Sequence, residues 1–338
     1  MRRAAWALVI AAIVAGGLYL VGGLEVGAIE RAFPPVGTFV SVPGGRLQVL
    51  DLGREHEDAG TLVLVHGATS NLEEMALGLG RALAARYRVV LVDRPGHGWS
   101  DRPDGPADAS PARQAALIAA ALDGMHIGKA IIVGHSWGGT VALAMALDQP
   151  AHVGGLVLIS PAAEPDLGGN YRWYVRSGAT QIFASLPFDR IVAVPLGLLF
   201  LHAGAAAVFA PTPVPADFVQ EAALPLMLRP SQLRADAEDL AALDGWLRGA
   251  APRWSTIHVP TLVVTGDRDR VVDPARQAEV VARAIPGARL VVVPHAGHLP
   301  QYADPVAVET AIGELAGAVS DAAQPVPPAA AEDLRRDP

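Results

Sequence analysis

The residue most able to do chemistry is a serine set between two glycines. Ser136 stands two positions after Gly134 and two before Gly138, where the apolar run 131–133 gives way to an alanine-rich helical segment. A strand, a sharp turn and a helix in this order strain the serine backbone and require small neighbours where the chain doubles back. The hydroxyl is left exposed, and the first N–H groups of the helix favour negative charge beside it. The sequence therefore predicts a nucleophilic serine.

A serine hydroxyl is a poor nucleophile at neutral pH and needs a base, which a carboxylate must orient. Both partners occur downstream, each after an apolar run typical of a strand. Residues 261–265 lead into a loop with several aspartates, and residues 289–293 lead into a loop with two histidines. The carboxyl ends of strands in open α/β sheets gather at one edge. We therefore expect the serine, an aspartate and a histidine to lie together there.

In these features the sequence resembles the α/β-hydrolase superfamily, from about residue 38 to about residue 319. Four motifs carry the resemblance: His-Gly-Ala at 66–68, Asp-Arg-Pro-Gly-His-Gly-Trp-Ser at 93–100, the turn around Ser136, and Gly-His at 297–298 with Pro305 beyond. The resemblance implies an α/β class and the α/β-hydrolase fold, with a mostly parallel, doubly wound sheet. It also implies a helical cap inserted after the sixth strand.

The resemblance also implies which acid and base act. It places the catalytic acid three residues after a loop glycine, which selects Asp269 over Asp267 and Asp273. It places the base in the Gly-His pair, which selects His298 over His295. The expected catalytic triad is Ser136, Asp269 and His298.

An oxyanion hole follows from the same resemblance. The backbone N–H groups of Ala68 and Trp137 are expected to face the negative charge that develops on the substrate oxygen. The histidines beside these motifs, His66, His97 and His135, are expected to be structural. No metal site and no cofactor are expected, since the chain has no H-E-x-x-H motif and no cysteine.

The nucleophile type points to a reaction class. Superfamily members that open epoxides or displace halide use an aspartate at this turn, whereas serine favours acyl transfer through an acyl-enzyme. Hydrolysis of a carboxylic ester is the predicted reaction. The same residues also serve amides, thioesters, lactones, carbon–carbon cleavage and perhydrolysis, and these alternatives stay open. A function of another class, a hydrolase-like binding module without chemistry, is disfavoured because no triad residue is missing.

Charge and composition limit the kinds of molecule that this chain is expected to bind. The chain has 338 residues and a formal net charge of −8, which disfavours nucleic acid as a partner. The expected cap, residues 161–255, is rich in aromatic side chains and prolines, and predicts an apolar entrance for a small hydrophobic or amphiphilic acyl substrate. Its aromatic residues are Tyr171, Trp173, Tyr174, Phe183, Phe188, Phe209, Phe218 and Trp246.

The amino terminus predicts a membrane anchor. An uncharged run from Ala4 to Leu24 follows Arg2 and Arg3 and is long enough, at about 30 Å, to cross a bilayer. The two arginines place the amino terminus in the cytoplasm and the catalytic domain outside it, on the periplasmic side in a bacterium. A cleaved signal that leads to secretion is the alternative.

The expected organisation has five parts. Residues 1–29 form the anchor or signal, and Glu30–Gly37 begins the core as a short linker. The remaining parts are the first half of the hydrolase core at 30–160, the cap at 161–255, the second half of the core at 256–319, and a disordered tail at 320–338.

Overall fold

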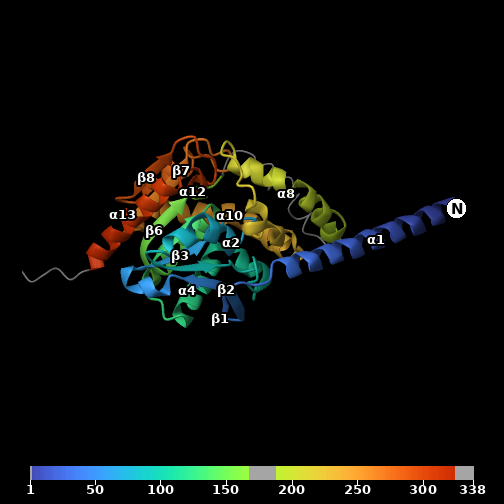
Figure 1. Cartoon of the computed structure of the whole chain (residues 1–338), viewed down its shortest axis with the longest axis horizontal. Helices are drawn as coiled ribbons and strands as arrows, with labels where there is room; N and C mark the ends of the chain where they lie inside the picture. Colours follow the sequence, from blue (N-terminus) through green and yellow to red (C-terminus); the bar gives the residue numbers. More distant parts are fainter. Residues whose placement is uncertain (1, 167–187, 324–338) are drawn as a thin grey trace, which may run out of the picture.

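Eight strands form one sheet in the order β1-β2-β4-β3-β5-β6-β7-β8. The structure is a computed structural model and describes residues 2–166 and 188–323 (Figure 1). The strands are β1 (Thr38–Val42), β2 (Gly45–Leu52), β3 (Thr61–Val65), β4 (Arg88–Val92), β5 (Ala130–His135), β6 (Val153–Ile159), β7 (Thr261–Gly266) and β8 (Arg289–Val293). The pairs β1–β2 and β2–β4 are antiparallel, and every other neighbouring pair is parallel. The predicted α/β-hydrolase fold is confirmed.

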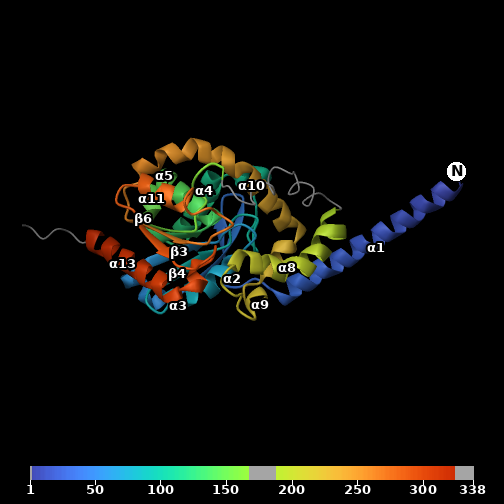
Figure 2. The same ribbon diagram turned by 90° about the horizontal axis from the view of Figure 1, so that it is seen from above.

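Side chains alternate along the buried strands between two helical layers. In β3, Val63 and Val65 face one layer, and Leu62 and Leu64 face the other. One layer contains α4 (Pro111–Gly124), α5 (Trp137–Asp148) and α11 (Ala278–Ala284), and the other contains α2 (Leu72–Met75), α3 (Arg81–Leu83) and α13 (Pro305–Ala323). Figure 2 shows the sheet between these layers. The parallel strands are apolar at nearly every position because both faces of the sheet are covered.

Short helical turns complete the core. They are η1 (Arg54–Ala59), η2 (Ala76–Gly80), η3 (Gly105–Ala109), η4 (Pro150–His152) and α12 (Pro300–Ala303). The turn η2 is π-helical and joins α2 to α3 without a break. These turns carry the chain between the strand ends where the site is built.

Between β6 and β7 the chain leaves the sheet and forms the expected helical cap. Its described elements are η5 (Asp189–Ala193), α8 (Val194–Phe209), α9 (Phe218–Glu221), η6 (Leu224–Leu228), α10 (Pro230–Ala250) and η7 (Ala251–Thr256). Four of the aromatic residues expected in the cap, Tyr171, Trp173, Tyr174 and Phe183, lie outside the described residues.

A single long helix, α1 (Arg2–Ala32), projects from one end of the molecule (Figure 1). Most of its large apolar side chains are exposed, and it is long and apolar enough to cross a bilayer. Its last turns differ, because Gly22, Val26 and Ile29 are buried on one face. This face packs against η5, α8 and η6 of the cap. The end of α1 is therefore part of the folded body.

Two boundaries differ from the sequence-based expectation. α1 continues to Ala32, where a linker was expected from Glu30, because Ile29 packs into an apolar cluster with the cap. α13 continues to Ala323, past the expected start of the tail. The rest of the expected tail lies outside the described residues.

Candidate active site

Ser136 lies at the sharp turn between β5 and α5, with a backbone φ of 53° and ψ of −116°. Residues other than glycine rarely adopt positive φ, so the surrounding fold holds this turn under strain. A Cβ added at Gly134 would overlap the carbonyl oxygen of Gly138, and one added at Gly138 would overlap that of Val65. The backbone N–H of Ser136 donates to the carbonyl oxygen of Ile159 at 2.8 Å. The two glycines and this hydrogen bond together hold the turn.

His298 and Asp269 form a buried pair. The Nδ1 atom of His298 lies 2.7 Å from Oδ2 of Asp269. The other carboxylate oxygen accepts hydrogen bonds from the N–H groups of Val271 at 2.8 Å and Val272 at 3.0 Å. Burial opposes ionisation of Asp269, but His298 and these two N–H groups outweigh it, so the pKa of the carboxyl lies below its usual value. An ionised Asp269 orients the imidazole through Nδ1 and leaves Nε2 for a substrate.

The competing residues named from the sequence lie elsewhere. Asp267 and His295 are exposed. Asp273 is half-buried, and its carboxylate accepts a hydrogen bond from the N–H of Ala275. The structure thus brings only Asp269 of the three aspartates to His298.

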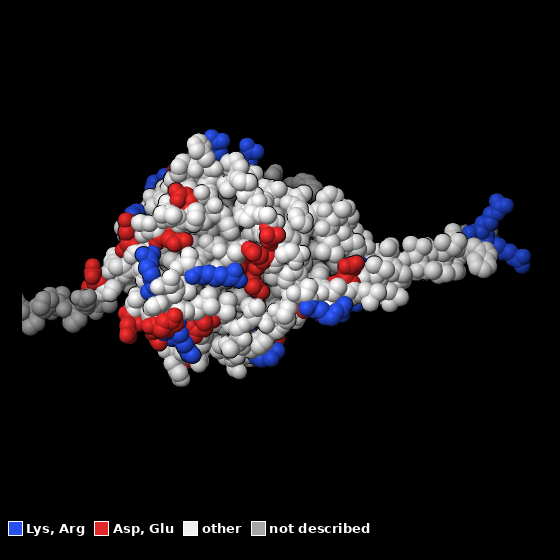
Figure 3. All heavy atoms as spheres, viewed as in Figure 1, with Lys and Arg blue, Asp and Glu red and all other residues white. Residues whose placement is uncertain are grey.

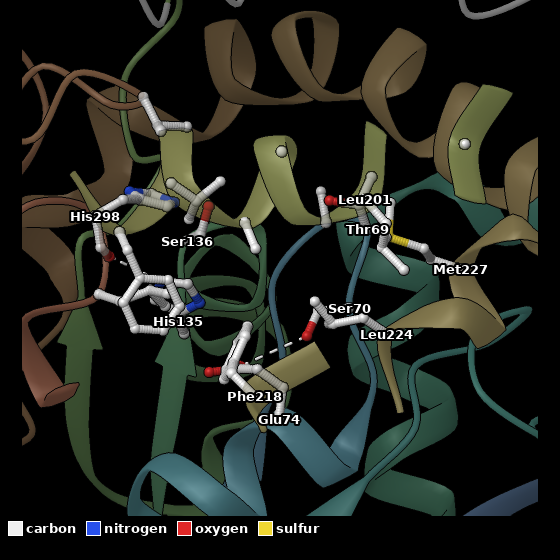
Figure 4. Close-up of a pocket in the computed structure, with 18 of the residues that line it drawn as sticks. Thr69, Ser70, Glu74, His135, Ser136, Leu201, Phe218, Leu224, Met227 and His298 are labelled. Carbon is white, nitrogen blue, oxygen red and sulfur yellow. Dashed lines mark hydrogen bonds between the residues drawn. The ribbon is translucent and has the colours of Figure 1, made fainter. Parts of the chain in front are cut away.

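Ser136 and His298 line one cavity (Figure 4). In the described part of the chain no hydrogen bond joins the two side chains. Catalytic hydrogen bonds are often long in unliganded sites and tighten when substrate binds. The geometry thus places the hydroxyl and the imidazole in reach of the same substrate.

His135, the residue before Ser136, packs against His298. Its Nε2 lies 3.1 Å from the carbonyl oxygen of His298, and the centres of the two rings are 4.9 Å apart. Burial lowers the pKa of His135 to about 3. His135 is therefore a neutral packing partner at physiological pH.

The two expected oxyanion donors flank the serine. Ala68 lines the cavity, and a Cβ added at the preceding Gly67 would lie 3.2 Å from Cβ of Ser136. Trp137 is the first residue of α5, where N–H groups have no partner inside the helix. Among the described residues, neither the Ala68 N–H nor the Trp137 N–H donates to another protein group. Both donors remain available to a substrate oxygen.

The cavity has a volume of about 370 Å³ and is walled by the cap. Its apolar wall includes Leu201, Phe209, Phe218, Leu224, Met227 and Leu228. Two of the aromatic residues expected from the sequence therefore line it, whereas Trp246 packs against Trp254 instead. A pocket with an apolar wall and a few polar groups at one side suits a largely hydrophobic ligand.

Known proteins share this fold. The sequence profile described as the alpha/beta hydrolase fold matches residues 60–305. The chain belongs to the α/β-hydrolase fold family.

A curated relative of this α/β hydrolase is the dihydrolipoyllysine-residue acetyltransferase component of the acetoin cleaving system of Cupriavidus necator. The two are 32% identical over 270 residues, which cover 78% of this chain and 64% of the relative. This chain therefore spans less than two thirds of that relative's length.

Solved structures show the same fold. An α/β hydrolase fold protein from Burkholderia ambifaria is 28% identical, with a TM-score of 0.68, and the match covers 82% of this chain and 96% of that one. A structure described as a membrane phospholipase A, a novel bacterial virulence factor, is 25% identical with a TM-score of 0.62. That match covers 95% of this chain and 100% of the other, and so reaches into α1.

A buried ionic network joins the core of this α/β hydrolase to α10 of the cap. The guanidinium of Arg94 donates to the carboxylate of Asp239 at 2.6 Å, and neither side chain is exposed. His97 lies 3.0 Å from the carboxylate of Asp236, which also accepts the backbone N–H of Thr69 at 2.9 Å. The sequence analysis missed both aspartates, since no local motif marks them.

Glu74 is a second residue that the sequence analysis missed. Its buried carboxyl lines the cavity and accepts a hydrogen bond from Ser70 at 3.5 Å (Figure 4). Burial raises the pKa of Glu74 to about 7. No signal around Glu74 in the sequence distinguishes it from the neighbouring Glu73.

Proposed function

We propose that this α/β hydrolase is a membrane-anchored serine hydrolase that cleaves carboxylic esters of hydrophobic or amphiphilic acyl compounds. The observation that carries the proposal is the buried Asp269–His298 pair, whose histidine lines the same cavity as Ser136. A strained serine, an oriented imidazole and two free backbone N–H groups are the parts that acyl transfer requires.

In this mechanism the Ser136 hydroxyl attacks the ester carbonyl while Nε2 of His298 accepts its proton. The carbonyl oxygen becomes an oxyanion that accepts hydrogen bonds from the N–H groups of Ala68 and Trp137. His298 then donates the proton to the leaving alkoxide, and the alcohol departs from an acyl-enzyme on Ser136. A water molecule, deprotonated by His298, attacks the acyl-enzyme; His298 then returns the proton to the Ser136 oxygen as the acid is released. Asp269 stabilises the imidazolium that forms in each half of the cycle.

The cavity supports a hydrophobic substrate. Leucine, phenylalanine and methionine side chains of the cap supply its wall, and its polar groups cluster around the serine and around Glu74. The likeness to a structure described as a membrane phospholipase A supports an ester of a long acyl chain.

α1 supports attachment to a membrane. The first part of the helix exposes large apolar side chains to the surroundings, as a bilayer span does and a core helix does not. Arg2 and Arg3 orient this span with the amino terminus in the cytoplasm and the catalytic domain outside.

A fluorophosphonate probe tests the proposed nucleophile. The wild-type chain should be labelled in proportion to active protein, and the Ser136→Ala variant should not. A series of p-nitrophenyl esters of increasing chain length then tests the substrate, with rising kcat/KM expected into the medium and long chains. Unchanged labelling of the variant would overturn the role of Ser136, and hydrolysis of amides or diketones in preference to esters would reassign the reaction.

A further inference from the structure

The outer face of α8 is apolar and exposed. Leu199 and Phe200 are 72% and 59% exposed, and Leu196, one turn earlier on the same side, is 44% exposed. Residues 191–216 contain no Asp, Glu, Lys or Arg. Surface helices of soluble proteins carry charges on their solvent face, and a contiguous exposed apolar face marks a contact with lipid or protein.

This face lies beside the proposed membrane span. Both views of the ribbon show α8 starting next to the middle of α1 (Figures 1 and 2), and the two helices are in contact. The backbone of η5, the turn that leads into α8, approaches α1 closely, because a Cβ added at Gly22 would overlap the carbonyl oxygen of Arg190. In Figure 3 the middle of α1 and the adjoining surface of the body are white, and the charged side chains at this end lie only at the tip of α1 and near its base. The apolar faces of α1 and α8 therefore form one region.

Two side chains indicate the level of the membrane surface on α1. The guanidinium of Arg190 lies over the ring of Tyr19 at 5.1 Å. Tyrosine and arginine are favoured at the height of lipid headgroups, where an apolar stem and a polar end are both accommodated. Leu196 follows Arg190 by less than two helical turns, so the first half of α8 lies near the same level.

The inner face of α8 lines the cavity. Gly197, Leu201 and Ala205 contribute to its wall, and the small residues among them keep the wall thin. Phe200 both lines the cavity and is more than half exposed. Phe200 therefore stands where the cavity wall meets the outer surface.

We propose that the first half of α8 inserts into the interfacial layer of the bilayer next to α1, and that acyl chains enter the cavity from the membrane beside Phe200. A bilayer is favoured over a second protein because the apolar face of α8 continues onto a helix that is itself long and apolar enough to span lipid. The entry route rests on the proposed function, whereas the position of α8 does not.

Single-cysteine labelling tests the position of α8 in the full chain, which has no native cysteine. An NBD fluorophore is attached at Leu199→Cys, and the chain is reconstituted in phosphatidylcholine–phosphatidylglycerol vesicles with brominated lipids. Ile10→Cys in α1 is the positive control. Val306→Cys on α13 is the matched control, because Val306 and Leu199 are equally exposed at 72%.

Bromolipids should quench the fluorophore at residues 10 and 199 and leave the one at residue 306 bright. Equal, weak quenching at 199 and 306 would overturn the proposal. So would a blue-shifted but unquenched signal at 199 together with disulfide cross-linking between two chains, because that result assigns the face to a second copy.

Activity tests the entry route. Leu199→Glu should lower hydrolysis of a vesicle-borne long-chain ester roughly ten-fold, since a charge at the bilayer is costly, and leave a soluble short-chain ester unaffected. Val306→Glu should change neither rate. Labelling of Ser136 by the fluorophosphonate confirms that each variant is folded. If Leu199→Glu lowered the rates on both esters equally, or changed neither rate, entry beside Phe200 would be overturned. If the wild-type chain were not labelled, the proposed function would be refuted and the quenching result would still stand.

Discussion

The carboxylate of Asp236 accepts a hydrogen bond from the backbone N–H of Thr69 at 2.9 Å, which ties the cap helix α10 to the loop after β3. Thr69 directly follows Ala68, whose own N–H is an expected oxyanion donor. The cap thus fixes the position of one catalytic group in the core, although the two residues are far apart in the chain.

Removing this contact should slow catalysis. Asp236→Ala should lower kcat by about ten- to a hundred-fold with a smaller change in KM, because the Ala68 N–H matters most in the transition state. Asp236→Asn, which keeps an acceptor oxygen, should lose less. Steady-state kinetics on a p-nitrophenyl ester measures both. Asp244→Asn serves as the control, because Asp244 lies on the same helix and pairs with Arg248 rather than with the core loop. Equal losses in the Ala and Asn variants would argue against the hydrogen bond.

The triad should act as one unit. Ser136→Ala, Asp269→Asn and His298→Gln should each lower turnover by about 10³-fold or more, and combining them should add little. Asp267→Asn and His295→Gln are the matched controls and should be mild, since both side chains are exposed. A severe defect in Asp267→Asn would reassign the acid.

Gly138, beside the turn at Ser136, should tolerate no larger side chain. Gly138→Ala should lower the free energy of unfolding by about 3 kcal/mol or more and abolish labelling, because the added Cβ overlaps the Val65 carbonyl oxygen. Gly317→Ala in α13 meets open space and should raise the free energy of unfolding by up to about 1 kcal/mol. Urea unfolding compares the two, and a well-folded, active Gly138→Ala chain would contradict the close packing of this turn.

Glu74 should make stability depend on pH. Burial raises its pKa from 4.5 to about 7 in the folded chain, so the unfolded chain releases this proton at lower pH than the folded one. The free energy of unfolding should therefore fall as pH rises through this window, by up to about 3 kcal/mol from this group. Two other titratable groups lie near the Glu74 carboxyl: His298 and Tyr302. The Tyr302 hydroxyl donates a hydrogen bond to the backbone carbonyl oxygen of Glu74 at 3.0 Å.

Glu74→Gln should remove that fall. Urea unfolding at pH 5 and pH 8 should show the variant gaining stability over wild type at the higher pH. Glu55→Gln, at an exposed position on η1, should track wild type at both pH values. A constant difference between Glu74→Gln and wild type across the pH range would show that the group titrates normally.

Truncation should separate the span from the part of α1 that belongs to the fold. Removal of residues 2–18 should release an active chain from carbonate-washed membranes, whereas removal of residues 2–30 should also lower Tm. The longer deletion strips Val26 and Ile29, which are buried against the cap. Thermal melts and fluorophosphonate labelling of both soluble products measure this, and equal Tm values would mean that the helix end contributes no stability.

The sequence predicts the fold well, and it picks out the strand-end residues that the structure brings together, because these signals are local. An apolar run, a glycine spacing and a loop histidine each identify a strand end, and parallel strands bring those ends together. Asp236 and Glu74 carry no such signal, since their roles arise from contacts made only when the cap closes over the core. The buried face of α1 was also missed, because Gly22 lies within the uncharged run, and Val26 and Ile29 follow it over a stretch too short to show a helical pattern.

The buried pair of Arg94 and Asp239 divides the cap into two kinetic parts. Lifting α10 from the core would also expose Leu240, Leu243 and Leu247, each worth about 1.5–3 kcal/mol when buried, so such conformations should hold well under about 1% of the population. Rearrangements confined to η5, α8 and α9 leave the pair intact and carry no such penalty. Amide hydrogen exchange should therefore be slow in α10 and faster in α8. The rate at which a product leaves the cavity should be set by the motions of η5, α8 and α9.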